Sequence, residues 1–297
     1  MTETQLRLSE AVPLGTVMIQ ELCRNHRIRA LFLKGPAATI LGVRPAVPSS
    51  DIDVLVLKSD MEATVGLLQA NGWAIRGEGW DEYYSSHSIT MFHTMWPCDI
   101  DIHYRFPGIA NTASEAFEVL YAERQPVILA GHAVEVPGPL GAVCIQALHA
   151  LRNPWIRAQQ ESFRFLLEEV PAPDKESLLA FARELQALAA MKPYFTSAYP
   201  MPADYPWPRP SLEWIARTTA RTRGSIRLME LIDAPWRDKF RIFARQLVPT
   251  AGTTIDTGVG PLDKQTPTER IRVNLASAAS SVRETVEYLK KRNGQAS

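Results

Sequence analysis

Two acidic residues inside an apolar stretch constrain this chain more than any other feature of its sequence. Asp51 and Asp53 lie near the end of residues 31–57, LFLKGPAATILGVRPAVPSSDIDVLVL. Because successive side chains of a strand point to opposite faces, both aspartates would share one face while Ile52 and the valines that follow fill the other. Burying two carboxylates together is costly unless a cation or hydrogen bonds compensate the lost hydration. The stretch therefore predicts a strand whose acidic face is neutralised by a ligand or by other side chains.

The same alternation returns downstream in residues 98–103, CDIDIH. Asp99, Asp101 and His103 would share one strand face, with isoleucines on the opposite face. Carboxylate oxygens are the ligands that hard divalent cations such as Mg²⁺ prefer. Two acidic strand faces therefore indicate a divalent metal site.

The composition is typical of a globular protein with one large domain or two ordinary ones. The 297 residues are 46% apolar and 22% charged. The formal net charge is zero, but residues 1–125 carry 10 Lys and Arg against 15 Asp and Glu, and residues 126–297 carry 22 against 17. The acidic first half is consistent with a metal site, and the basic second half with contacts to an anionic ligand. Two solvated surfaces of opposite charge explain the same distribution equally well. Neither half is basic enough to predict nucleic-acid binding from charge alone.

The cysteines and the first residues bear on location. Cys23, Cys98 and Cys144 are odd in number and far apart, which disfavours a disulfide framework or a structural zinc site. The segment MTETQLRLSEAVPLG lacks the basic start and apolar core of a secretion signal, and no apolar run reaches the roughly 20 residues of a membrane-spanning helix. We expect a reducing, cytoplasmic location and no membrane partner.

The first part of the chain alternates helices and strands, and the second part is helical. Apolar spacing and turn residues predict helices over residues 6–25 and 37–41. A third predicted helix begins at the Ser-Asp-Met-Glu capping box of residues 59–62 and ends at residues 71–72. Apolar runs predict strands over residues 28–33, 51–57, 73–76, 87–92 and 99–106 and a hairpin of residues 125–129 and 133–136. Further helices are expected over residues 139–152, 158–169, 175–191, 211–223, 235–246 and 268–292, with a proline-rich connection at 199–210 and a Gly/Thr-rich loop at 250–267. We expect a domain boundary near residue 138.

An ordered set of motifs resembles the DNA polymerase β-type nucleotidyltransferase superfamily. A strand ending in Lys34-Gly35 is followed by a loop with Arg44, by Ser50-Asp51-Ile52-Asp53, and later by Asp101-Ile102-His103. The pattern is most similar to a bacterial family of uncharacterised nucleotidyltransferases, in which a Leu-Lys-Gly turn precedes an Arg and an Asp-Ile-Asp, with a later Asp-x-His. The resemblance spans about residues 28–155. It implies an α+β fold in which a catalytic domain with a mixed sheet and flanking helices, residues 1–138, precedes a helical domain on the nucleotide and acceptor side, residues 139–297.

The resemblance also implies an activity and assigns roles to residues. The enzyme would move a nucleoside monophosphate from a nucleoside triphosphate to a hydroxyl group, using two Mg²⁺ ions, or Mn²⁺, about 3.5 to 4 Å apart. Asp51, Asp53 and Asp101 would hold the metals, and Asp101 would also assist deprotonation of the acceptor hydroxyl. The nucleotide would be bound by Lys34, Gly35, Arg44 and Ser50. His103 and Asp99 would lie behind the metal ligands, with Asp99 as the alternative third ligand.

Several alternatives stay open at this point. Gly35 is followed by Pro36 where the wider superfamily has a serine, and proline lacks both the hydroxyl and the N–H that could contact phosphate. This departure favours a non-catalytic nucleotide-binding or regulatory module as the second reading. A third interpretation is a glycosyltransferase with an Asp-x-Asp motif. It is disfavoured because such folds generally have several strand-helix units before the motif, and here only one strand precedes it. The acceptor, which could be a small molecule, a tRNA or a protein, is left open, as are the base of the donor and the oligomeric state.

Overall fold

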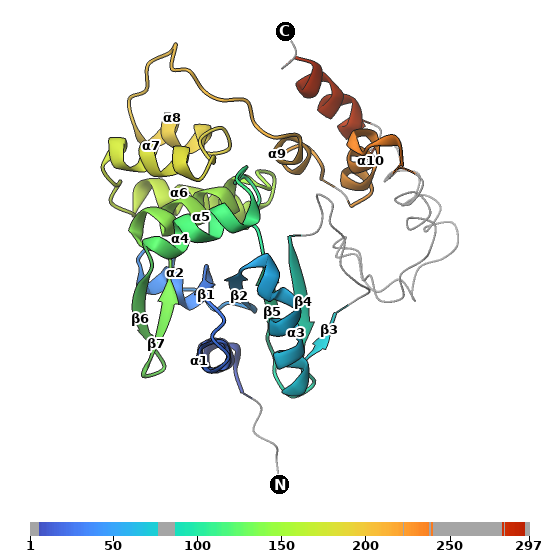
Figure 1. Ribbon diagram of the computed structural model, residues 1–297. Helices are drawn as coiled ribbons and strands as arrows, with labels where there is room; N and C mark the ends of the chain where they lie inside the picture. Colours follow the sequence, from blue (N-terminus) through green and yellow to red (C-terminus); the bar gives the residue numbers. More distant parts are fainter. Residues whose placement is uncertain are drawn as a thin grey trace. The chain divides into compact units, whose positions relative to one another are not determined.

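The computed structural model describes residues 6–76, 87–221, 223–237, 239, 281 and 283–294 (Figure 1). The described residues fall into two compact units. The first unit comprises residues 6–76 and 87–211, and the second comprises the described residues from Leu212 onward. The functional boundary expected near residue 138 lies inside the first unit and stays a prediction.

A five-stranded mixed sheet lies at the centre of the first unit. Its strands, in spatial order, are β1 (Ala30–Phe32), β2 (Asp51–Val56), β5 (Asp99–His103), β4 (Ser88–Phe92) and β3 (Ala74–Ile75). β2 and β5 are parallel, and the other three neighbouring pairs are antiparallel. A parallel pair requires a crossover connection, here made by α3 (Met61–Ala70), β3 and β4. The crossover places the two acidic motifs side by side.

Helix α1 (Leu8–Asn25) covers the apolar face of β2. The helix packs against β1, β2 and the later strand β7. A Cβ atom added to Gly15 would lie 2.6 Å from Cδ1 of Ile52, so a larger residue at this position would require the Ile52 side chain to move. Since Ile52 alternates with the aspartates, its contact with α1 fixes the orientation of the strand and turns the acids to the opposite face.

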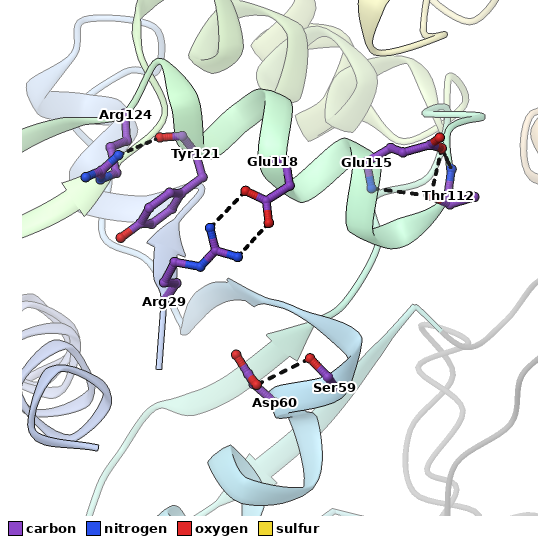
Figure 2. Close-up of polar contacts among 8 residues, drawn as sticks. All are labelled: Arg29, Ser59, Asp60, Thr112, Glu115, Glu118, Tyr121 and Arg124. Atoms are coloured by element: carbon purple, nitrogen blue, oxygen red, sulfur yellow. Dashed lines mark hydrogen bonds and ion pairs between the residues drawn. The ribbon is translucent and has the colours of Figure 1, made fainter. Parts of the chain in front are cut away.

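The connection after β2 departs from the sequence prediction at its start. The predicted capping box of residues 59–62 is wrong: a 3₁₀ turn, η1 (Lys58–Asp60), precedes α3, whose N-cap is Asp60. The hydroxyl of Ser59 donates to the carboxylate of Asp60 at 3.3 Å (Figure 2). The turn uses the residues that the box would need, and Glu62 then falls in the first turn of α3. The predicted end of the helix at residues 71–72 is confirmed, since Asn71 is the C-cap.

The sequence interpretation missed helix α4 (Ala113–Ala122). It begins with a true capping box, in which the Thr112 hydroxyl accepts the Glu115 N–H at 3.3 Å and the Glu115 carboxylate accepts the Thr112 N–H at 3.0 Å. Arg29, just before β1, makes two hydrogen bonds to the Glu118 carboxylate and lies over the ring of Tyr121 (Figure 2). These contacts hold α4 against the start of β1.

The rest of the first unit is a hairpin followed by helices. The predicted hairpin is confirmed as β6 (Gln125–Leu129) and β7 (His132–Val136), a separate two-stranded sheet. The helices are α5 (Pro139–Leu151), α6 (Arg157–Glu168), α7 (Lys175–Glu184) and α8 (Lys192–Ala198), and together with α4 they gather on one side of the strands (Figure 1). The single helix predicted over residues 175–191 is wrong, because α7 ends at Glu184 and Gln186 takes the left-handed φ of +50°. The proline-rich residues 199–210 form neither helix nor strand, as predicted.

The second unit is helical in its described part. It contains α9 (Leu212–Arg217), α10 (Arg223–Asp233) and a C-terminal helix that includes residues 283–293. Ile215, Met229 and Tyr288 lie in its apolar cluster. α9 is shorter than the predicted helix over residues 211–223, and α10 was not predicted; parts of the helices predicted over 235–246 and 268–292, and the whole loop 250–267, lie outside the described residues. Among the described residues, no helix is long and apolar enough to span a membrane. The predicted fold class, a mixed sheet with flanking helices followed by a helical region, is confirmed.

Candidate functional site

Strands β2 and β5 bring the two acidic motifs into register. The Cα partner of Asp51 is Asp99, and that of Asp53 is Asp101. One carboxylate oxygen each of Asp53 and Asp101 and one ring nitrogen of His103 all lie within 4.8 Å of one another. We call the surface formed by Asp51, Asp53 and Asp101 the acidic face.

Asp53 is the most enclosed of these acids and has two positively polarised neighbours. Its Oδ1 atom lies 2.6 Å from Nζ of Lys34 and 2.8 Å from Nε2 of His103, and the residue is 6% exposed. Lys34 reaches this position because the Leu33 N–H donates to the Asp53 carbonyl where β1 borders β2. Burial alone would raise the pKa of Asp53, but the charge of Lys34 and the hydrogen bond from His103 hold it well below its ordinary value. Asp53 is therefore ionised over the physiological range of pH.

Asp51, two residues earlier on the same face, has the opposite electrostatic environment. Burial, the like charge of Asp53 and that of Asp101 raise the pKa of Asp51 above its ordinary value, and Lys34 opposes the shift. Arg44, in the loop before β2, is half-buried and donates to the Val47 carbonyl at 3.1 Å. Burial lowers the pKa of Arg44, and the charges of Asp51 and Asp53 oppose that change. The cations near Asp51 therefore do not offset its burial and the like charges of its neighbours.

On β5 the structure distinguishes the two candidates for a third acidic residue. Asp101 accepts a hydrogen bond from the Thr90 hydroxyl at 2.6 Å, and Thr90 is its Cα partner on β4. Asp99 is paired instead with Arg76, at 2.6 Å between Nη2 and Oδ1, where both side chains are partly exposed. The geometry therefore groups Asp101 with Asp53. The contact of Thr90 was missed from the sequence, although its alternation with buried Ile89 and Met91 places it on the acidic side of β4.

The Lys34-Gly35 turn lies beside the acidic face. Gly35 has a φ of +61°, and a Cβ there would lie 3.1 Å from the hydroxyl oxygen of Ser49, so the turn requires glycine. Ser49 is buried beneath the turn, whereas Ser50, the residue predicted to bind nucleotide, is exposed, and its carbonyl accepts the Asp99 N–H at 3.2 Å. Sequence reasoning missed Ser49, which no motif distinguishes from Ser50.

A pocket of about 520 Å³ adjoins the turn. We call it the polar pocket. Lys34 and Arg44 lie in its wall, next to Gln146 and His149 of α5 and Gln159 and Phe165 of α6. Burial, together with the nearby charges of Lys34 and Arg152, lowers the pKa of His149 well below its ordinary value. The imidazole is therefore neutral, and its Nε2 atom lies 3.1 Å from the side-chain nitrogen of Gln159.

The donor set of the acidic face suits a divalent cation. Aspartate oxygens are ligands of Mg²⁺ and Mn²⁺, and the imidazole of His103 extends the set for Mn²⁺. Burial, and after it the like charges of Asp53 and Asp101, raise the pKa of Asp51, and a bound cation would oppose that shift. Among the described residues, Asp53, Asp101 and His103 form the cluster that could hold such an ion, and Asp51 lies beside it on the same face of β2.

Comparison with known proteins gives one match that covers most of the first unit. Residues 9–198 match the sequence pattern of a family described as "Uncharacterised nucleotidyltransferase". No curated protein matches significantly.

Solved structures match at low identity. An antigenic nucleotidyltransferase-like protein from Paracoccidioides brasiliensis matches with 16% identity and a TM-score of 0.41, over 63% of this chain and 91% of that one. ANT(2")-Ia in complex with adenylyl-2"-tobramycin matches with 14% identity and a TM-score of 0.40, over 59% and 98%. The lincosamide antibiotic adenylyltransferase LnuA, bound to lincomycin, matches with 11% identity and a TM-score of 0.36, over 53% and 96%. At these TM-scores the structures carry no weight for the function of this chain.

Proposed function

Since the chain belongs to the family of uncharacterised nucleotidyltransferases, we propose that it transfers a nucleoside monophosphate from a nucleoside triphosphate to a hydroxyl group by a two-metal mechanism. One observation carries the proposal: Asp53 and Asp101 stand in register on neighbouring parallel strands, with Asp51 on the same face and Lys34 2.6 Å from Asp53. Oxygen ligands on rigid strands, next to a buried cation, are what phosphoryl chemistry needs.

In this proposal the acids bind the ions and orient the acceptor. Two bound Mg²⁺ or Mn²⁺ ions supply the positive charge that stabilises the attacking and leaving oxygens of an in-line displacement. Asp51 and Asp53 would hold the ions from β2 and Asp101 from β5. Asp101 would also accept the proton that the acceptor hydroxyl loses as its oxygen bonds to the α-phosphorus and pyrophosphate leaves. Thr90 and His103 hold Asp101 and Asp53 in place through the hydrogen bonds described above.

Lys34, Gly35, Arg44 and Ser50 are the proposed contacts of the triphosphate. The ammonium of Lys34 lies between the acidic face and the polar pocket, so it can neutralise phosphate oxygens beside the metals. Arg44 adds a second cation on the same side. Gly35 offers its backbone N–H in the turn, and Pro36 contributes none. The proposed cytoplasmic location would supply both the triphosphate and magnesium.

Binding and turnover, measured separately, test the proposal. We expect Mg²⁺-dependent binding of a nucleoside triphosphate to the wild type and its loss in the double variant Asp51→Asn, Asp53→Asn. The matched control is Asp204→Asn, which changes an exposed aspartate of the proline-rich connection. Equal binding by the double variant and the wild type would overturn the metal assignment.

Pyrophosphate release distinguishes transfer from binding alone. Candidate acceptors of three classes, small hydroxylated molecules, tRNA and proteins, are added in turn with Mg²⁺ and each of the four nucleoside triphosphates. Release that depends on Asp101 supports transfer. Binding without release in any arm favours the non-catalytic module, for which the Gly35-Pro36 turn is the supporting feature. A preference for UDP-sugars with Mn²⁺ would favour the glycosyltransferase.

A further inference from the structure

Three residues in the wall of the polar pocket each have a buried polar atom with no hydrogen-bond partner among the described residues. The atoms are Oε1 of Gln146, Nδ1 of His149 and Oε1 of Gln159. Gln146 is only 2% exposed, so its oxygen is shielded from water as well. A buried polar atom without a partner costs roughly 1 to 3 kcal/mol of stability. Three of them around one pocket indicate groups that are kept for a ligand.

The three groups come from two helices and converge on one pocket. Gln146 and His149 are one turn apart on α5, and Gln159 lies on the first turn of α6, where its side-chain nitrogen lies 3.1 Å from Nε2 of His149. Because the imidazole is neutral and its Nε2 accepts from Gln159, its Nδ1 carries the proton and is a donor. The three atoms are shielded from solvent, but their residues line the pocket. The terminal torsion of a glutamine is broad, so each amide can turn to present a donor or an acceptor to an incoming group.

Phe165 and Lys34, which also line the pocket, suit the base and the phosphates of a nucleotide. Phe165 of α6 provides an aromatic surface, on which any base can stack. Lys34 lies in the wall and also contacts Asp53, so a ligand in the pocket can extend from the acidic face into it. The volume of about 520 Å³ falls in the usual range for small-molecule sites.

From this arrangement, and resting on the proposed nucleotidyl transfer, we propose that the polar pocket is the nucleobase site of the donor. Gln146, His149 and Gln159 pair with the hydrogen-bonding edge of the base, and Phe165 packs on its face. These residues select among nucleoside triphosphates, while the phosphates are held by the acidic face and its metals. A site whose buried polar groups need particular partners discriminates against bases that leave them unpaired.

Equilibrium titrations of the full chain with Mg²⁺ test this site. The probes are the four nucleoside triphosphates and inorganic tripolyphosphate, which has no base. We expect at least about tenfold discrimination among the four triphosphates, and weaker binding of tripolyphosphate than of the preferred one. Gln146→Leu and Gln159→Leu should each reduce the affinity for the preferred triphosphate about 2- to 10-fold and leave that for tripolyphosphate unchanged. The control Gln69→Leu, an exposed glutamine on α3, should change neither.

Thermal unfolding shows whether a loss of affinity has a structural cause. The Gln146 oxygen has no partner to lose, so Gln146→Leu should unfold at the temperature of the wild type or above it. Equal affinity for all four triphosphates, or variants that keep the affinities of the wild type, would overturn the assignment and leave the pocket to the acceptor. Failure of the proposed function looks different: discrimination among triphosphates that survives without pyrophosphate release keeps the base site and removes the transferase.

Discussion

The acidic face and the polar pocket share the side chain of Lys34, yet they are built in opposite ways. On the acidic face the most deeply buried carboxylate, Asp53, is matched by a cation and an imidazole at hydrogen-bonding distance. In the polar pocket, three buried atoms have no partner among the residues that the structure describes. Both regions are costly to bury. The Asp53 carboxylate recovers that cost through Lys34 and His103, although Nδ1 of His103 also has no partner among the described residues, whereas none of the three pocket atoms does.

The contrast separates two kinds of preparation for a ligand. A neutralised carboxylate keeps its position on a rigid strand before a metal arrives, which is what a catalytic group needs. An unpaired amide gains most of its hydrogen-bond energy when a ligand arrives, which is what a selective site needs. Substitutions in the two regions should therefore affect turnover, stability and selectivity differently.

The greatest loss of turnover should follow from Asp101→Asn. It removes a negative charge proposed to hold the metals, so transfer should fall on the order of 10³-fold, since metal ions supply several kcal/mol to such reactions. Steady-state pyrophosphate release measures the effect. The matched variant Asp99→Asn, which loses only the partly exposed pair with Arg76, should stay within a few-fold of the wild type. The reverse order would exchange the roles of the two aspartates.

Asp53 and Asp51 should respond to the same substitution with opposite changes in stability. Asp53→Asn leaves Lys34 buried without its anion and should lower the free energy of unfolding by about 3 kcal/mol. Asp51→Asn removes a carboxylate whose pKa is raised by burial and by Asp53, so the metal-free protein should melt about 1 to 3 °C higher. Both variants should lose transfer. Calorimetry in a chelating buffer measures the unfolding temperature of each variant. If both unfold at lower temperatures than the wild type, or both at higher ones, the electrostatic contrast between Asp51 and Asp53 is wrong.

The pH dependence of stability should carry the signature of His149. Its pKa is lowered in the folded chain, so at mildly acidic pH the imidazole binds a proton in the unfolded chain but not in the folded one. Stability from this group is complete above the unfolded pKa of about 6.5 and declines as the pH falls, by at most about 1.4 kcal/mol per unit. In His149→Phe this part of the slope should vanish. Urea unfolding at about pH 7.5 and about pH 5.5 gives the difference between the two proteins. Parallel slopes would place the imidazole in contact with water.

The smallest change should come from the ion pair between Arg29 and Glu118, outside both regions (Figure 2). Both side chains are substantially exposed, so Glu118→Gln should cost less than about 1 kcal/mol and leave turnover as it is. Chemical unfolding and pyrophosphate release check the two parts. A drop in turnover would mean that α4 positions the acidic face through β1.

The acids could be recognised from sequence, but their cross-strand register could not. Alternation with period two is local, so DIDV and DIDI reveal their two faces directly. The pairing of Asp53 with Asp101 depends on a crossover through α3, β3 and β4, which sequence spacing does not fix. The turn at Lys34-Gly35 predicts a phosphate contact for Lys34. Its ion pair with Asp53 depends on β1 lying beside β2, which local spacing does not fix.

Two errors in the helical elements had different causes. α4 was not predicted, although Thr112 and Glu115 form the same type of capping box that was predicted, wrongly, at residues 59–62. The break after α7 has no such signal, because Gln186 takes a left-handed conformation that usually calls for glycine. The unpaired atoms of the polar pocket were also beyond prediction, since α5 is buried on nearly every side and its sequence marks no single face as special.

Lys34 acts as an internal counter-ion for Asp53, which lets the acidic strand reach its buried position before any metal is bound. In the proposed function, folding would therefore not depend on metal binding. Asp53 would exchange the ammonium of Lys34 for a metal ion while β2 and β5 keep it in place. We therefore expect the chain to stay folded but inactive when magnesium is scarce. It should then resist proteolysis and regain activity when the ion is restored.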